Sequence, residues 1–152
     1  MIGKMGDLVQ LIKNNSMKKF QEKEIYVYVA SPYTNGWMPS NIKRQFRIGE
    51  KLLILGVTPF VPLIYHFLDL YTNFSEKEWL KFDISWLRKC DAVIRIKPLD
   101  ENDVEIPSPG ADGEEAEANK LGIPVFYSIS EFIEHFYNDL DPKKLGKYLD
   151  MQ

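Results

Sequence analysis

Hydrophobic runs alternate with amphipathic stretches from residue 25 onward, and this alternation predicts a sheet covered by helices. Residues 25–30 form a run of β-branched and aromatic side chains (IYVYVA), which is typical of a buried strand. Short apolar runs over 57–61, 91–97 and 123–127 predict three further strands. Strands that alternate with helices favour a parallel sheet with helices on both faces.

Helices are predicted where apolar residues recur at three- and four-residue spacing and where capping residues begin or end the pattern. We expect helices over about 40–55, 75–89, 113–121 and 130–138, and a last short helix from residue 141. The second begins with a capping box, and the fourth with a serine cap at its first residue. The expected inward face of the first helix consists of Ile42, Phe46, Gly49, Leu52 and Leu53.

Three segments fall outside this alternation. Residues 1–24 have helical spacing and predict a loosely attached extension ahead of one domain, 25–152. Residues 63–74 are aromatic and poorly periodic, which indicates a broken helix or the rim of a site. The loop over 98–107 is long and acidic; we interpret it as a solvated excursion, with a substrate-selecting lid as the alternative.

Composition narrows the class of protein. The 152 residues, 45% of them hydrophobic, suit one globular domain. A net charge of −3 argues against a nucleic-acid polymer as partner, and the absence of an 18-residue apolar run argues against a membrane partner. One cysteine, Cys90, cannot form an internal disulfide, so we expect a cytoplasmic protein. Two distant histidines and no glycine-rich nucleotide loop leave catalysis to carboxylates, hydroxyls and backbone amides, without a metal.

Asp83 interrupts the apolar stripe of the helix expected over 75–89. It lies four residues after Trp79 and three before Trp86, so helical periodicity places it among tryptophans. A buried carboxylate is costly unless it is paired or holds a proton. The spacing leaves two interpretations open, which are a structural aspartate bonded to a backbone amide and a catalytic carboxyl group.

A second carboxylate, Glu114, follows a segment rich in glycine and proline. The segment 108–113 (SPGADG) should free backbone N–H groups to converge on an anion. We expect Glu114 in the first helical turn, ionised by the helix dipole and facing the sheet on a side shared with Ala118 and Leu121. A plain acidic helix start is the alternative; it explains Glu115 and Glu117 as solvated charges but not an inward Glu114. Two inward carboxylates roughly 5 Å apart can cleave a glycosidic bond, one attacking the anomeric carbon and the other moving protons.

Three motifs in this order resemble the nucleoside 2-deoxyribosyltransferase superfamily, which includes 2′-deoxynucleoside 5′-monophosphate N-glycosidases. The first is 25–33 (IYVYVASPY), similar to that family's opening strand and turn. The second is 83–91 (DISWLRKCD), similar to its Asp-x-x-Trp-Leu-x-x-x-Asp helix and following strand. The third consists of Ser108, Gly110, Glu114 and Ala118, followed by the run GIPV over 122–125.

The resemblance implies a flavodoxin-like three-layer α/β sandwich with a parallel sheet of four to five strands. It implies Glu114 as nucleophile, Asp83 as second catalytic carboxylate, and Tyr28 as the residue that orients the nucleophile through its hydroxyl. It also implies a small nucleoside or nucleotide substrate, no cofactor, and a homodimer or larger homo-oligomer. The expected substrate-binding residues are Ser31, Tyr33, Ser108 and Gly110.

Position 108 bears on which reaction follows. Transferases of this superfamily tend to place an aspartate there, which bonds a sugar hydroxyl but repels a phosphate. A serine beside Gly110 and a helix N-terminus suits a 5′-phosphate. We therefore favour hydrolysis of a nucleoside 5′-monophosphate with release of the free base. Base exchange by a nucleoside 2-deoxyribosyltransferase is the alternative.

Two other functions stay open. The spacing Pro109-Gly110-x-x-Gly113-x-x-x-Glu117 loosely resembles the motif of cytokinin-type phosphoribohydrolases, in which Glu117 would be catalytic, although a glycine and a threonine of that motif are missing. A non-catalytic nucleotide-binding or sensor domain is the alternative of another class. Two buried carboxylates argue against it, because a pure binder does not need them.

The helix expected over 40–55 also carries a basic surface. We interpret this surface as solvated, with a phosphate contact by Arg44 or Arg47 as the alternative. His66 lies in the aromatic segment and is interpreted as a rim residue, with a substrate contact as the alternative. The basic surface consists of Lys43, Arg44, Arg47 and Lys51.

Overall fold

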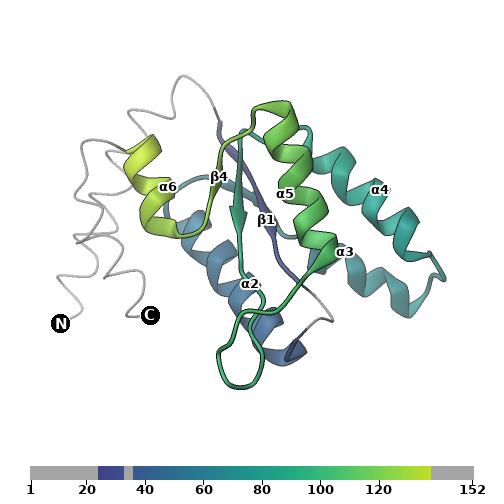
Figure 1. The fold of residues 1–152 in the computed structure, drawn as a ribbon. Coiled ribbons are helices and arrows are strands. Elements are labelled where there is room, and N and C mark those ends of the chain that lie inside the picture. The colour runs from purple at the N-terminus through teal and green to yellow at the C-terminus, as the bar shows by residue number, and fades with distance from the viewer. Residues whose placement is uncertain (1–23, 33–35, 138–152) are drawn as a thin grey trace.

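A computed structural model describes residues 24–32 and 36–137 of the chain (Figure 1). Four strands form one sheet in the order β2-β1-β3-β4, and all of its pairs are parallel, as the alternating pattern predicts. The helices predicted near the N-terminus and from residue 141 lie outside the described residues. None of the helices in the described part has the length and apolar character needed to cross a membrane. The strands are β1 (Tyr26–Ala30), β2 (Thr58–Phe60), β3 (Ala92–Arg95) and β4 (Val125–Phe126).

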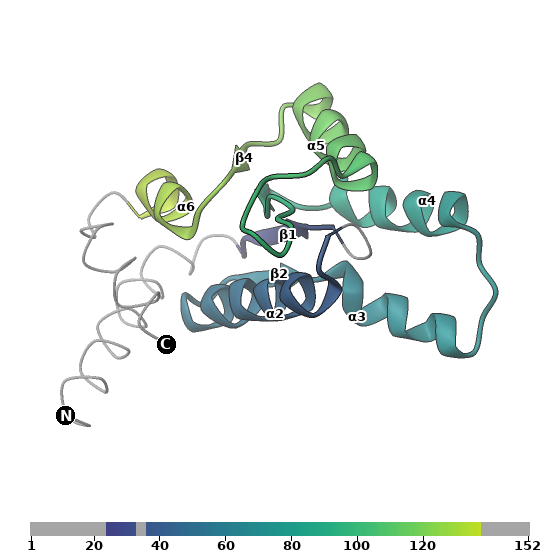
Figure 2. The ribbon, with the colours of Figure 1, turned by 60° about the horizontal axis from the view of Figure 1, so that its bottom comes forward.

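Helices cover both faces of this sheet and give the flavodoxin-like three-layer sandwich (Figures 1 and 2). On one face lie α2 (Met38–Ile54) and α6 (Ile129–Phe136), and on the other α4 (Glu76–Leu87) and α5 (Pro109–Leu121). The aromatic segment after β2 is a broken helix, as one of the two interpretations had it. It consists of α3 (Pro62–His66) and the 3-10 helix η1 (Phe67–Leu70).

The period of two along β1 separates the two hydrophobic cores. Val27 and Val29 enter the core beneath α2 and α6, whereas Tyr28 and Ala30 enter the core shared with α4 and α5. β3 follows the same alternation, since Val93 lies beside Tyr28 in the register of the sheet. The Tyr28 hydroxyl therefore points toward the helices that carry Asp83 and Glu114.

The capping box of α4 is confirmed, because Ser75 Oγ accepts from the Glu78 amide and the Glu78 carboxylate accepts from the Ser75 amide. The cap of α6 differs from the prediction. Ser128, rather than Ser130, accepts a hydrogen bond from the Glu131 amide at 3.1 Å and begins this helix.

The inward face of α2 also differs from the prediction, since Phe46 and Leu53 are exposed. Its buried positions include two amide side chains, Asn41 and Gln45. Gln45 donates a hydrogen bond to the Pro32 carbonyl, just after β1, at 3.3 Å. Hydrophobicity alone cannot identify such a face, since a buried amide such as Gln45 binds the backbone rather than the apolar core. The buried residues are Asn41, Gln45, Gly49 and Leu52.

Candidate active site

Glu114 lies in the second turn of α5 rather than in the first. Pro109 occupies the start of the helix, and the Asp112 amide already donates to the Ser108 carbonyl at 2.8 Å. Proline at the first helical position has its φ preset for helix, so α5 begins about four residues before the predicted start near Gly113. Because the dipole acts within the first turn, the prediction that it keeps Glu114 ionised is wrong.

The Glu114 side chain is buried in contact with a tyrosine. The residue is 6% exposed, and the Tyr28 hydroxyl donates to its Oε1 at 2.7 Å. Ala118 is buried with it as predicted, whereas Leu121, predicted on the same face, is exposed at the end of the helix. Burial raises the pKa of Glu114 to about 8; the Tyr28 bond opposes this rise, the charge of Asp83 adds to it, and the charge of Arg95 opposes it. Glu114 of the free protein is therefore mostly protonated at neutral pH.

Tyr28 is suited to remain a hydrogen-bond donor. It is fully buried at the centre of the sheet. Burial raises its pKa well above the usual value, and the charges of Glu114 and Asp83 raise it further. The phenol therefore keeps its proton across the neutral range and fixes one oxygen of the Glu114 carboxyl group. The sequence-based prediction paired these two residues, and the structure brings them together.

Asp83 approaches the same pair from α4. It is 4% exposed, and its Oδ2 lies 3.0 Å from His66 Nε2. Its Oδ1 is buried without a hydrogen-bond partner among the described residues. The structural interpretation required a backbone amide as partner, whereas the residue bonded to Asp83 here is a histidine side chain. A buried carboxylate oxygen without a partner marks a position that a ligand can complete.

An aromatic wall adjoins the carboxyl groups. The Phe60 ring stacks on Tyr28 at 5.5 Å and on Trp86 at 4.9 Å between centroids, and on Tyr65 at 5.3 Å. Trp86 was predicted within a buried stripe, yet it is 36% exposed, so this wall is open to solvent at one side. Phe60 and Tyr65 had not been singled out from sequence, although the aromatic residues around positions 60–74 were a signal.

The residues expected to bind substrate follow β1 or begin α5. Ser108 is buried at the N-cap of α5, where its hydroxyl makes no capping bond. Gly110 is exposed, with open space where a Cβ would lie, and Gly113 has the same open space. Ser31 is half-buried and donates to the Pro32 carbonyl at 3.2 Å. Tyr33 lies outside the described residues.

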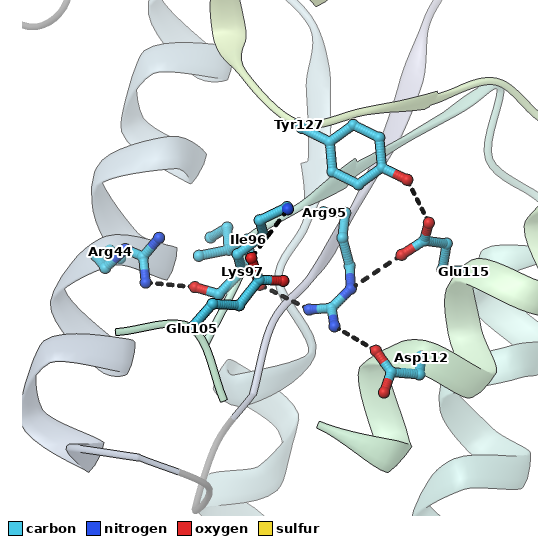
Figure 3. A network of polar contacts seen from close by, with 8 residues as sticks. All are labelled: Arg44, Arg95, Ile96, Lys97, Glu105, Asp112, Glu115 and Tyr127. Atoms are coloured by element: carbon cyan, nitrogen blue, oxygen red, sulfur yellow. Dashed lines mark hydrogen bonds and ion pairs between the residues drawn. The ribbon is translucent and has the colours of Figure 1, made fainter. Parts of the chain in front are cut away.

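A buried arginine, Arg95, organises the other side of α5 (Figure 3). At the end of β3 it donates to Asp112 Oδ1 at 2.7 Å and to Glu115 Oε2 at 3.2 Å, and Glu115 also accepts from the Tyr127 hydroxyl. The interpretation of Glu115 as a solvated charge is therefore wrong. Arg95 was not predicted, although a cation within the apolar run AVIRI over 92–96 signals a buried pair.

Glu117 is engaged in a different contact. Arg88 of α4 donates to its Oε1 through Nε at 3.0 Å and through Nη2 at 2.6 Å. The hydrogen bond from Arg88 lowers the pKa of Glu117, so this carboxylate stays ionised. Glu117 is ion-paired rather than simply solvated, and it makes no bond to Tyr28 or Asp83. No group of three or more potential metal ligands occurs within the described residues.

The likeness to known proteins is structural. No protein-family model and no curated protein matches the chain. A solved structure of a 2-deoxyribosyltransferase from the psychrotolerant bacterium Bacillus psychrosaccharolyticus, described as a biocatalyst for nucleoside synthesis, is similar with a TM-score of 0.50 and 26% identity. The match covers 66% of this chain and 69% of that one. The resemblance suggested by the three motifs is confirmed at the level of the fold, and the protein it resembles is an enzyme.

Proposed function

We propose that this protein cleaves the N-glycosidic bond of a nucleoside 5′-monophosphate through an ester between the sugar and Glu114. The observation that carries the proposal is the buried Tyr28–Glu114 hydrogen bond of 2.7 Å, next to the Asp83 charge. Glu114 makes no ion pair within the described part of the chain. Burying a carboxylate in this way costs stability, so a chemical role explains it better than packing does.

The first step forms the ester and releases the base. The ionised Glu114 carboxylate attacks the anomeric carbon while the carbon–nitrogen bond breaks and its electron pair passes to the base. Asp83 takes up a proton from solvent and gives it to the departing base. In the second step water attacks the anomeric carbon, Asp83 takes the proton of that water, and Glu114 leaves as a carboxylate. Tyr28 holds one carboxyl oxygen of Glu114 throughout and transfers no proton.

Two features support a nucleotide as substrate. Ser108 and the Gly110 amide lie at the start of α5, where the serine hydroxyl does not cap and the first amides have no partner within the helix. Hydroxyl and amide donors at a helix N-terminus suit a phosphate, whereas an aspartate at this position would repel it. The half-open stack of Phe60, Tyr65 and Trp86 offers flat rings against which a base can pack.

Base exchange is the second candidate, and the similar 2-deoxyribosyltransferase favours it. Transfer and hydrolysis share the Glu114 ester and differ in whether a second base or water resolves it. The cytokinin-type alternative required a catalytic Glu117, and the double hydrogen bond from Arg88 to Glu117 argues against that role. The two buried carboxyl groups, Asp83 and Glu114, likewise argue against a non-catalytic sensor, because a pure binder does not need them.

Turnover of a deoxynucleoside and of its 5′-monophosphate, each with and without a second free base, tests this proposal. Chromatography follows the released base and any new nucleoside. We expect the monophosphate to be hydrolysed much faster than the nucleoside, and Glu114→Gln to be inactive on both. Equal use of the free nucleoside, or base exchange without net hydrolysis, identifies the transferase instead. No reaction on any substrate identifies the sensor.

Self-association belongs to the same proposal. The segment from α3 to the start of α4 exposes a run of large apolar side chains, and contiguous apolar surface of this kind is typical of protein–protein contacts. We expect a homodimer or larger assembly by sedimentation, and a monomer at micromolar concentration contradicts this part. The exposed residues include Ile64, Phe67, Leu68, Leu70, Tyr71 and Phe74.

A further inference from the structure

A cavity of about 380 Å³ lies between α2 and the end of β3, and it is separate from the site around Glu114. Ile94 and Ile96 form part of its wall, and both belong to the core beneath α2. Tyr28 belongs to the core on the opposite face of the sheet, with α4 and α5. None of Tyr28, Asp83 or Glu114 lines this cavity. The sheet therefore separates the cavity from the carboxyl groups.

The charged side chains that line this cavity are all basic. Arg95 and Lys97 already have acidic partners, Asp112 and Glu115 for the first and Glu105 for the second. The other basic side chains that line the cavity belong to α2. A net positive cavity in a protein of net charge −3 is a local feature that overall composition does not explain.

Two arginines of α2 supply charge that no contact neutralises. Arg44 is half-buried and donates to the Lys97 carbonyl at 2.6 Å, as Figure 3 shows, and the charge of Asp103 acts on it without an ion pair. Arg47 is exposed and makes no ion pair or hydrogen bond within residues 24–32 and 36–137. Planar guanidinium groups bind phosphate oxygens through paired N–H donors.

The remaining wall is apolar and aromatic. The Tyr127 ring lines the cavity, and its hydroxyl is held by Glu115 on the far side. Ile48 of α2 and Ile94 of β3 complete an apolar surface beside the two arginines. A volume of about 380 Å³ falls in the range of small-ligand sites. A phosphate beside an aromatic body matches both parts of this wall.

We propose that this cavity is a second binding site, for a phosphate monoester with an aromatic body, of which a mononucleotide is the simplest example. Arg44 and Arg47 bind the phosphate, and Tyr127 packs against the aromatic group. The small volume of the cavity and the acidic remainder of the protein favour a small molecule over a nucleic-acid strand. The proposal requires no activity at Glu114, so it stands independently of the proposed function.

Site-resolved NMR titration with adenosine 5′-monophosphate, on the full chain carrying Glu114→Gln to prevent turnover, tests this site. The Lys97 and Tyr127 amides report on the cavity, and the Gly110 and Ala111 amides report on the start of α5. We expect the Lys97 and Tyr127 resonances to shift. Arg47→Gln should weaken the affinity fitted from these shifts about tenfold, since one charge-assisted contact is lost. Lys43→Gln, an exposed change on the same helix outside the cavity, is the matched control.

The ligand class is tested in the same titration. Inorganic phosphate and adenosine, added separately, should each bind at least tenfold more weakly than the monophosphate, because each contacts only part of the wall. The proposal is overturned if Lys97 and Tyr127 do not shift, if Arg47→Gln matches Lys43→Gln, or if phosphate alone binds equally well. A lack of shifts at Gly110 and Ala111 counts against the proposed function and leaves the cavity site intact.

Discussion

Asp112 and Glu115 lie on one side of α5 and Glu114 on another, and the two sides differ in how carboxylate charge is compensated. Arg95 binds Asp112 and Glu115 directly, at 2.7 and 3.2 Å. Among the described residues Glu114 is hydrogen-bonded only by the hydroxyl of Tyr28, and burial raises its pKa to about 8. Charge that is neutralised by a fixed partner stabilises the fold, whereas charge that is buried without one costs stability and is available for chemistry.

Removal of the uncompensated carboxylate should have the largest effect. Glu114→Gln keeps the shape and the bond from Tyr28 but cannot attack carbon. We expect a loss of roughly four orders of magnitude or more in kcat for base release. Glu115→Gln on the paired side is the matched control and should stay within about fivefold. Near-normal turnover by the Glu114 variant would remove the distinction between the two sides.

Asp83→Asn comes next, because it removes the proton-transfer group while the nucleophile remains. We expect a loss of roughly 100- to 10,000-fold in kcat with an unchanged circular dichroism spectrum. Asp69→Asn is the matched control, since Asp69 accepts from the Trp79 indole at 2.6 Å and takes no part in the Glu114 contacts. An unfolded Asp83 variant would show that this aspartate is structural.

The Arg95→Met variant tests how much the ion pairs of Asp112 and Glu115 contribute to the stability of the fold. The change leaves Asp112 and Glu115 without their shared cation and removes two side-chain ion pairs from a residue that is 4% exposed. We expect the free energy of unfolding to fall by about 3 kcal/mol in urea titrations. Lys97→Met is the control, because its pair with Glu105 is exposed and should contribute under about 1 kcal/mol. Equal losses in the two variants contradict a special role for Arg95.

The pH profile of kcat/KM distinguishes a buried nucleophile from a solvated one. A carboxyl group with a pKa near 8 must lose its proton before attack, so kcat/KM should rise about tenfold between pH 6 and 7 and level off above pH 8. Stability should change in the opposite sense. The folded protein keeps this proton between pH 4.5 and about 8 while the unfolded chain does not, so stability falls as pH rises through this range. Glu114→Gln should remove that slope, and a slope that persists in the variant contradicts the assignment.

Glu117→Gln should have the smallest effect. Arg88 already holds this carboxylate away from the Tyr28–Glu114 pair, so we expect kcat within about twofold of the unmodified protein. Steady-state kinetics on the same substrate check this value. A loss comparable to that of Glu114→Gln would move the nucleophile to Glu117 and revive the phosphoribohydrolase alternative.

Periodicity and capping predicted the succession of strands and helices along the chain, and helical spacing placed Asp83 and Glu114 facing inward, as the structure does. The environment of each carboxylate could not be predicted. The start of α5 at Pro109 was missed because Gly110 and Gly113 disfavour a helix, although a proline at the first helical position favours one. The sequence also does not show that Arg95 binds Asp112, because Arg95 lies at the end of β3, 17 residues before Asp112.

The most direct test of the central claim is the position of the covalent adduct. A 2′-fluoro nucleoside 5′-monophosphate slows breakdown of the glycosyl ester, so the sugar should remain on the protein. Fragment-ion mass spectrometry of the peptide that contains α5 can separate Glu114 from Glu115 and Glu117. We expect the sugar mass on Glu114 alone. An adduct on Glu115 or Glu117, or none at all while base is released, would contradict this claim.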